Sequence, residues 1–231
     1  MNKISVIVPL FNEEAILPSF LDHLRRFSVN EVICVDGGSE DRTGEILKRW
    51  MGASGEGRRL VSSSIRGRAS QMNEGAKRAG GEILLFLHAD SLLHPGALSA
   101  ISDAFEDPSC VGGAFRLKID SPRFFLKSIA AFVNVRSRWL NLPYGDQGYF
   151  VRREVFEKLG GFKNLPLMED VDFIRRLKKA GRIVLLIEPM TTSARRWIKT
   201  GYFYTSLRNL ALLILYFLGV TPEKLARWYH E

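Results

Sequence analysis

Apolar residues gather in short runs through the first ninety positions, and segments with helical spacing separate those runs. The runs at 5–10 and 83–87 are apolar on both faces, which predicts buried parallel strands. A further strand is predicted at 31–36 and a weaker one at 60–63. Between them, the spacing predicts helices over 16–24, from the Gly37-Gly38-Ser39 turn to Trp50, and over 69–79. This order predicts a mostly parallel central sheet flanked by helices, an α/β fold with right-handed crossovers.

The pattern changes after Phe105. Residues 114–120 alternate between apolar and polar, which predicts a strand with one solvated face. Further along we expect a helix at 124–140, a strand at 145–152 leading into a helix that stops at Gly160-Gly161, a helix at 168–180, a strand at 183–187 and an apolar helical tail at 201–229. We therefore expect one α/β domain over residues 1–198, with a helical appendage over 199–231 packed on it.

Asn12 stands where the N-cap of the first helix is expected, before Glu13 and Glu14. In parallel α/β sheets, ligands bind outside the carboxyl ends of the strands. Asn12 with Glu13, Asp36, and His88 with Asp90 all occupy such ends, so these residues are candidates for a site.

The chain carries a formal net charge of +8, which suits nucleic acid, anionic lipid or a polyanionic small molecule. No known nucleic-acid-binding module accompanies the charge, so we expect no nucleic-acid partner. Cys34 and Cys110 form no metal-binding spacing and are predicted to be buried thiols in a reducing compartment. The N-terminal apolar run is broken too early for a signal peptide, which favours a cytoplasmic location.

His88-Ala89-Asp90 ends an apolar run. Residues two apart on a strand point to the same side, so His88 and Asp90 are predicted to hold one cation that also bridges a diphosphate. Oxygen ligands suit Mg²⁺ or Mn²⁺, and the imidazole favours Mn²⁺. The alternative is that Asp90 only caps a following helix.

Glu169 and Asp170 open a predicted helix and suit a general base that removes a proton from an alcohol, although carboxylates there also complement the helix dipole. The Arg195-Arg196 pair can hold a diphosphate, and Trp197 can stack on a ring. Arg68 follows Gly67 in a basic loop that also suits a phosphate. An ordinary basic surface explains these arginines equally well.

Four segments in a fixed order resemble the inverting family 2 glycosyltransferases of GT-A fold. They are Val6 to Glu14, Val35 to Asp41, Leu85 to Ser91, and Gly160-Gly161-Phe162 followed by Glu169-Asp170. The resemblance covers essentially the whole length. Residues 67–76 and 193–197 are also similar to a small bacterial subgroup associated with radical-SAM and selenoprotein genes.

The resemblance implies a role for each candidate. Asp90 would hold the metal, Asp170 would be the catalytic base, and Arg196 and Trp197 would stand near the diphosphate. From its place beside Asp170 at the helix start, we expect Glu169 to orient the acceptor. The nucleoside pocket would be lined by Pro9, Phe11, Asn12, Glu13 and Asp36, with Gln71 nearby. Gly37 departs from the family, which often carries a second acid there that reads a uracil edge.

The function implied is transfer of a sugar from a nucleotide-diphosphate sugar to a hydroxyl acceptor, with inversion and a divalent metal. Two alternatives stay open: a sugar nucleotidyltransferase, and a non-catalytic sugar-nucleotide-binding protein of the membrane surface. The apolar run Leu210 to Val220 is shorter than the roughly 20 residues that span a bilayer. We expect the C-terminal helices to contact a membrane at its inner face or to form a homodimer, and a lipid-linked acceptor is left open.

Overall fold

A computed structural model describes residues 3–52, 57–63 and 66–230, apart from the side chains of Arg196, Lys199 and His230. Its strands are β1 (Ile4–Leu10), β2 (Glu31–Asp36), β3 (Arg58–Ser62), β4 (Ile83–Phe86), β5 (Ser91–Leu92), β6 (Cys110–Asp120), β7 (Tyr149–Arg152) and β8 (Arg182–Ser193). Its helices are α1 (Leu17–Leu24), α2 (Thr43–Gly52), α3 (Arg68–Arg78), α4 (Ala97–Ala104), α5 (Phe124–Leu140), the 3-10 turn η1 (Gly145–Gln147), α6 (Arg153–Lys158), α7 (Glu169–Ala180), α8 (Arg195–Thr200), α9 (Tyr202–Phe217) and α10 (Pro222–His230).

The described strands form one sheet in the order β3-β2-β1-β4-β7-β6-β8-β5. The α/β fold is confirmed, but the sheet is mixed. The first four strands of that order pair in parallel, as expected, and β6 pairs in parallel with β8. β7 runs antiparallel to both β4 and β6, and β5 runs antiparallel to β8. The direction of β7 is set by long-range pairing, which the local sequence pattern does not carry.

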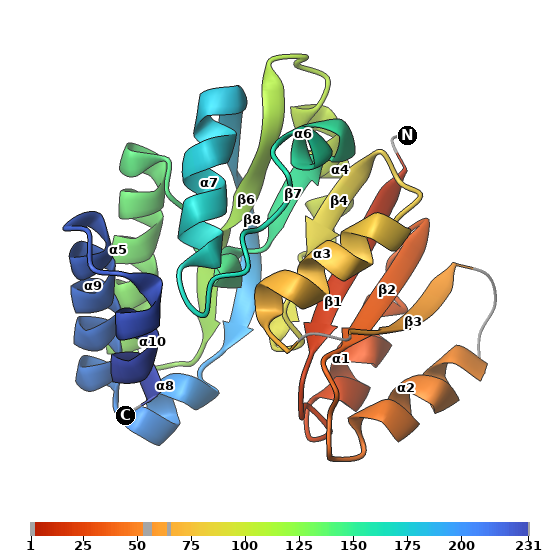
Figure 1. Ribbon diagram of the computed structural model, residues 1–231, viewed down its shortest axis with the longest axis horizontal. Helices are drawn as coiled ribbons and strands as arrows, with labels where there is room; N and C mark the ends of the chain where they lie inside the picture. Colours follow the sequence, from red (N-terminus) through yellow and green to blue (C-terminus); the bar gives the residue numbers. More distant parts are fainter. Residues whose placement is uncertain (1–2, 53–56, 64–65, 231) are drawn as a thin grey trace.

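Helices cover both faces of the sheet (Figure 1). Successive strand residues point to opposite faces. Val6 and Val8 therefore pack in one core cluster, with side chains of α1, α2 and α4, while Ile7 packs in the other, with side chains of α3, α6 and α7. Burial on both faces accounts for the uninterrupted apolar run of β1.

A third group of elements lies beside β6 and β8. Leu117, Ile119, Leu126, Ala194 and Trp197 form a small separate core there. In Figure 1, α5 and α9 stand along one edge of the molecule, with α10 beside them. The predicted boundary at 198/199 falls inside α8, and the division into domain and appendage stays a prediction. No helix in the described ranges is long and apolar enough to cross a membrane.

Three local predictions differ from the structure. Asn12 is not an N-cap: α1 begins at Leu17, and Asn12 has a positive φ of 53° in a loop held by hydrogen bonds to residues 39–43. His88 and Asp90 do not lie on a strand, because β4 ends at Phe86 and the chain turns at 89–90. The strand predicted at 145–152 starts only at Tyr149, after η1.

Candidate active site

A cavity of about 350 Å³ opens at the carboxyl ends of β1 and β2, and we call it the strand-end cavity. This is the edge of the sheet at which parallel strands offer ligand sites. Its lining residues come from the β1 and β2 ends, the start of α3 and the segment after β4: Pro9, Leu10, Phe11, Glu13, Gly37, Arg66, Gly67, Arg68, Gln71 and His88.

The loop after β1 is held by the loop after β2. The backbone N–H of Asn12 donates to Ser39 Oγ over 3.0 Å, and Asn12 Oδ1 accepts from the N–H of Glu40 over 2.9 Å. Asp36 Oδ1 accepts from both the N–H and the hydroxyl of Ser39. Asn12 and Asp36 therefore shape the cavity by tying loops together, and neither is among the residues that line it.

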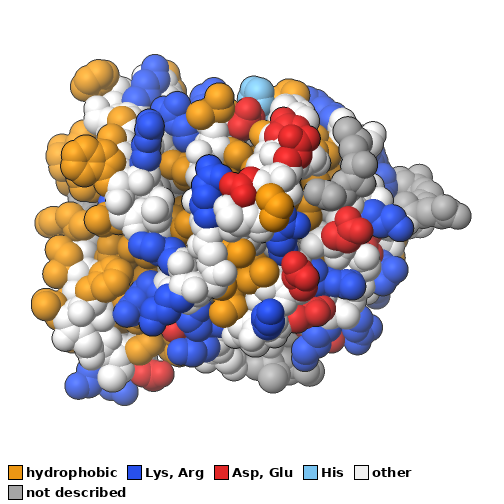
Figure 2. Space-filling model, turned by 90° about the horizontal axis from the view of Figure 1, so that it is seen from above, with side chains coloured by type: hydrophobic (Ala, Val, Ile, Leu, Met, Phe, Trp, Pro, Cys, Tyr) orange, Lys and Arg blue, Asp and Glu red, His pale blue; other side chains and the backbone are white. Residues whose placement is uncertain are grey.

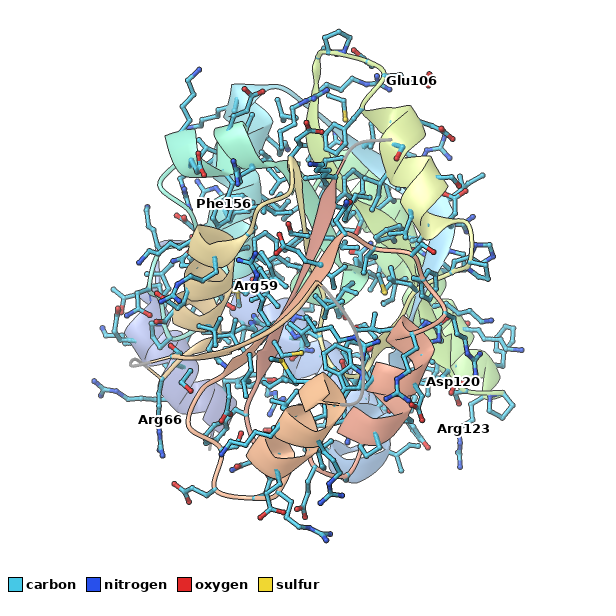
Figure 3. All side chains as sticks on the ribbon, turned by 90° about the vertical axis from the view of Figure 1, so that its right-hand side faces the viewer. Arg59, Arg66, Glu106, Asp120, Arg123 and Phe156 are labelled. Carbon is cyan, nitrogen blue, oxygen red and sulfur yellow. The ribbon has the colours of Figure 1, made fainter. Side chains whose placement is uncertain are left out.

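Phe11 supplies an aromatic surface at the mouth of the strand-end cavity. Its side chain is 44% exposed, and the Arg66 guanidinium lies 5.4 Å from the ring centroid. Figure 3 shows Arg66 on one rim of the molecule, across from Asp120 and Arg123. An exposed ring beside a cation offers a stacking surface for a planar heterocycle.

A second cavity of about 560 Å³, the helix cleft, lies between the start of α7 and the C-terminal helices. Arg66, Gly67 and Arg68 line both this cleft and the strand-end cavity, so the two spaces share a wall. The other lining residues are Tyr144, Gly145, Asp146, Asn164, Leu165, Pro166, Leu167, Met168, Glu169, Asp170, Val171, Asn209, Leu212 and Tyr229.

Glu169 and Asp170 occupy different environments despite being adjacent. Glu169 is buried, and its carboxylate accepts a hydrogen bond from Arg68 Nε. Burial raises the pKa of the Glu169 carboxyl, Arg68 opposes that rise, and the nearby Asp170 adds to it. Burial also disfavours charge on the Arg68 guanidinium, but Glu169 and Asp170 outweigh this and raise the pKa of Arg68. Glu169 is thus engaged in an ion pair.

Asp170 lines the helix cleft, and it lies close to Arg68 and His88, which line the strand-end cavity. Its Oδ2 accepts from the N–H of Gly145 over 2.9 Å and lies 3.8 Å from an Arg68 nitrogen. A Cβ added at Gly145 would lie 3.1 Å from Asp170 Oδ2, 3.2 Å from His88 Nε2 and 3.7 Å from an Arg68 nitrogen. A carboxylate, an imidazole and a guanidinium therefore converge on one point.

Asp90 faces a different space from His88. Asp90 lines a groove with Thr192 and Ser193, whereas His88 lines the strand-end cavity. Glu13 is an acidic group that interacts with Asp90. Partial burial raises the pKa of the Glu13 carboxyl, and the negative charge of Asp90 raises it further. The ion pair of Glu13 with Arg195 at 3.7 Å opposes this rise. Among the described residues, no group of three or more His, Cys, Asp or Glu side chains could hold a metal.

The donor set nevertheless suits a Mg²⁺ or Mn²⁺ ion that a substrate helps to bind. Such ions use one or two carboxylates together with substrate phosphates. Asp90, with Glu13 close by, supplies that number of carboxylates. His88 is directed toward Gly145 instead, so the structure does not bring the predicted pair of metal ligands into one cavity.

The side chains of Arg195 and Trp197, which are close in the sequence, lie in different environments. Trp197 is 9% exposed and packs with Leu117 and Ile119. The Arg196 side chain lies outside the described part of the chain, and Arg195 reaches Glu13 in the loop after β1. Sequence reasoning missed Gly145, although Gly145 and Gly148 around two polar residues signal a tight turn there.

A family model for "Glycosyl transferase family 2" matches residues 5–160. Curated relatives include a probable glycosyltransferase, YdaM, of Bacillus subtilis, 24% identical over 204 residues, which are 78% of this chain and 47% of that protein. Glycosyltransferase AglE of Haloferax volcanii is 28% identical over 197 residues, 77% of this chain and 62% of that protein. The chain thus spans about half the length of these relatives.

Solved structures share the fold. Mannosyltransferase PcManGT from Pyrobaculum calidifontis, in complex with GDP-Man and Mn²⁺, superposes with a TM-score of 0.66 at 23% identity, covering 82% of this chain and 56% of that one. S. aureus TarS 1–349 in complex with UDP-GlcNAc gives 0.69 at 21% identity, covering 92% and 66%. The fold is that of GT-A glycosyltransferases, and with two-thirds of its length matched by the family model, this chain belongs to glycosyl transferase family 2.

Proposed function

We propose that this protein transfers a sugar from a nucleoside-diphosphate sugar to an acceptor hydroxyl, with inversion at the anomeric carbon. The observation that carries the proposal is the position of Asp170 in the helix cleft, beside Arg68 and His88 of the strand-end cavity. In this proposal the strand-end cavity binds the nucleotide and the helix cleft binds the acceptor. The narrower likeness to the radical-SAM-associated subgroup stays a prediction.

The proposed reaction is one displacement. The Asp170 carboxylate takes the proton from the acceptor hydroxyl, and the oxygen attacks the anomeric carbon from the face opposite the diphosphate. The new carbon–oxygen bond forms as the bond to the diphosphate breaks, and its electron pair leaves with the diphosphate. A single attack from the opposite face inverts the configuration. Glu169, held by Arg68, positions the start of α7 so that Asp170 lies beside Arg68 and His88.

Asp90 is the residue that we propose to hold a divalent cation, with Glu13 beside it. Mn²⁺ or Mg²⁺, when bound, would neutralise charge on the departing diphosphate. Arg68 lines both cavities and adds a fixed positive charge beside the point of transfer. Arg196 and Trp197 near the diphosphate, and Asn12 and Asp36 around the nucleoside, remain parts of the proposal.

Release of nucleoside diphosphate from a panel of UDP-, GDP-, ADP- and CDP-sugars, with MnCl₂ present, tests the function. Water serves as a slow acceptor, so the measurement works before the acceptor is known. We expect release from at least one donor, and far less from Asp170→Asn. The proposal would be overturned if none of these donors binds and none is cleaved.

We also propose that the apolar edge formed by α5 and α9 contacts an anionic membrane. Phe124 and Trp139 on α5 are each 84% exposed, and Phe203, Leu207 and Leu218 in and after α9 are 70–75% exposed. Hydrophobic side chains gather on that side in Figure 2. Exposed Arg123, just before α5, and exposed Lys127 and Arg138 within it add positive charge. Aromatic and aliphatic groups among basic ones suit an anionic bilayer surface.

The same helix connects this edge to the proposed acceptor site. Asn209 and Leu212 of α9 line the helix cleft. A membrane-bound α9 would place the cleft near the bilayer surface, which supports a lipid-linked acceptor. Flotation with vesicles of phosphatidylglycerol and phosphatidylcholine tests the contact. We expect the protein to float with the vesicles, and we expect Leu207→Asp to reduce the bound fraction. A protein that stays unbound and is dimeric would assign this edge to a homodimer instead.

A further inference from the structure

The side-chain amide of Gln71 is held in one orientation at the bottom of the strand-end cavity. It is only 4% exposed, and its Nε2 donates to the carbonyls of Leu10 and Val35 over 2.7 and 2.9 Å. A primary amide has two N–H hydrogens, and these two carbonyls use both. The orientation follows from this network, and Oε1 is left as an acceptor with no hydrogen-bond partner among the described residues.

Gln71 occupies the space that a side chain at position 37 would fill. A Cβ added at Gly37 would lie 2.9 Å from both Cδ and Nε2 of Gln71, and 3.2 Å from its Oε1. Gly37, Gln71 and the exposed ring of Phe11 all line the strand-end cavity. The cavity therefore combines a stacking surface with one fixed acceptor oxygen.

We propose that Gln71 Oε1 selects the base of the donor nucleotide by accepting a hydrogen bond from a ring N–H. Uracil, thymine and guanine carry such a ring N–H on the edge used for base pairing. The corresponding ring nitrogen of cytosine and adenine is unprotonated and is itself an acceptor. Cytosine and adenine carry a donor on this edge only at the exocyclic amino group, which lies beside the ring nitrogen. A base held with its ring nitrogen facing Gln71 would therefore leave two acceptors unpaired, and a site built around one hydrogen bond rejects a ligand that lacks the donor at that position. This inference rests on the proposed binding of a nucleotide in the strand-end cavity.

Calorimetric titration of the full chain with UDP, GDP, CDP and ADP, in the presence of Mn²⁺, tests the selection. We expect UDP or GDP to bind about 10- to 100-fold more tightly than both CDP and ADP, the range that follows from one unpaired buried acceptor. Tightest binding of CDP or ADP would overturn the inference, and this comparison needs no variant.

Gln71→Leu keeps the approximate size and removes the acceptor, so we expect the preference for ring N–H bases to collapse. The variant also loses two hydrogen bonds to the backbone, which lowers stability. The ratio between bases is therefore the readout, because lost stability alone weakens all four nucleotides alike. Gly37→Ala, whose Cβ would displace the Gln71 amide, is expected to reduce the same ratio while keeping the side chain of Gln71 intact.

Gln147→Leu is the matched control. Gln147 is another fully buried glutamine that donates to a backbone carbonyl, that of Phe115 over 2.9 Å, and it is not among the residues lining either cavity. We expect it to lose stability and keep the base preference. If none of the four nucleotides binds, the proposed function fails. If they bind without preference, or if Gln71→Leu keeps the preference, only the present inference fails.

Discussion

Arg68 and Glu169 join the first residues of α3 and α7 through a hydrogen-bonded ion pair, although they lie 101 positions apart in the sequence. Glu169 is buried, whereas 36% of the Arg68 side chain is exposed. Removing the arginine would leave a buried carboxylate with part of its charge uncompensated. The ion pair therefore matters to the fold as well as to the position of Asp170.

Arg68→Ala is expected to lower the free energy of unfolding by about 1–3 kcal/mol, the cost of leaving a buried polar group unpaired. Urea unfolding measures it. Arg25→Ala is the control, because Arg25 pairs with Asp22 at the surface, where 44% and 66% of the side chains are exposed, and such pairs contribute about 0–1 kcal/mol. Equal losses in the two variants would contradict a stabilising role for the Arg68–Glu169 pair.

Asp170→Asn is expected to slow sugar transfer by about 10²- to 10⁴-fold, because an amide cannot take the acceptor proton. The affinity for the donor should stay nearly unchanged, since the proposed base contacts the acceptor. Steady-state turnover and donor titration measure the two effects separately.

Asp172→Asn is the matched control for that variant. Asp172 is two residues away, but its carboxylate is engaged by Lys163 at 3.0 Å and Arg176 at 2.7 Å. We expect Asp172→Asn to affect stability while keeping turnover. Near-parental transfer by Asp170→Asn would show that another group, with Glu169 the first candidate, takes the proton.

Donor binding is expected to depend on a divalent cation through Asp90. A chelator should weaken binding of the nucleotide sugar, and Mn²⁺ or Mg²⁺ should restore it. Asp90→Ala should behave like the chelated protein, with a melting temperature close to that of the parent, because Asp90 is half-exposed. His88→Ala should keep the response to metal, since His88 faces Gly145. Tight donor binding by Asp90→Ala in excess chelator would show that arginines alone hold the diphosphate.

Both thiols are expected to resist alkylation in the folded protein. Cys34 and Cys110 are fully buried, and burial raises the pKa of both, that of Cys34 to about 12. The thiolate is the reactive form, so iodoacetamide at a pH near 9 should modify the folded protein slowly and the unfolded protein fast.

The raised pKa of Cys34 also predicts how stability changes with pH. An unfolded thiol loses its proton near about pH 8.5. The folded protein keeps the Cys34 proton until pH is about 12. The contribution of Cys34 to stability is therefore complete below about pH 8.5 and is lost as pH rises toward 12. Cys34→Ala should show a smaller fall in stability across that window, and an identical fall would contradict the assignment to Cys34.

The sequence predicted the bounds of some elements closely. The bounds of β2 and α5 agree with the predicted residues 31–36 and 124–140. The antiparallel direction of β7 was not predictable, because it depends on pairing with β4 and β6 across the sheet. Local periodicity carries no information about strand partners.

The candidate site shows the same limit. Asp170 and Arg68 were predicted because their residue types suit the chemistry, and Gln71 because of the family resemblance. Asp170 lines the helix cleft, Gln71 lines the strand-end cavity, and Arg68 lines both. His88 and Asp90 were paired by strand spacing, and the turn at 89–90 sends them into different spaces. The convergence on Gly145 arises from three separate segments, so no local pattern indicates it.

The two cavities draw on different stretches of the chain. Among the described residues, the lining of the strand-end cavity comes from residues 9–88, whereas that of the helix cleft, apart from residues 66–68, comes from residues 144–229. If the strand-end cavity binds the donor and the helix cleft binds the acceptor, as proposed, then donor choice and acceptor choice are encoded in separate stretches of the sequence. Substitutions in the later stretch can shift a descendant protein to a new acceptor while its donor is retained. Residues 66–68 are the part of the described lining that the two cavities share, so a substitution there would be expected to change both preferences together.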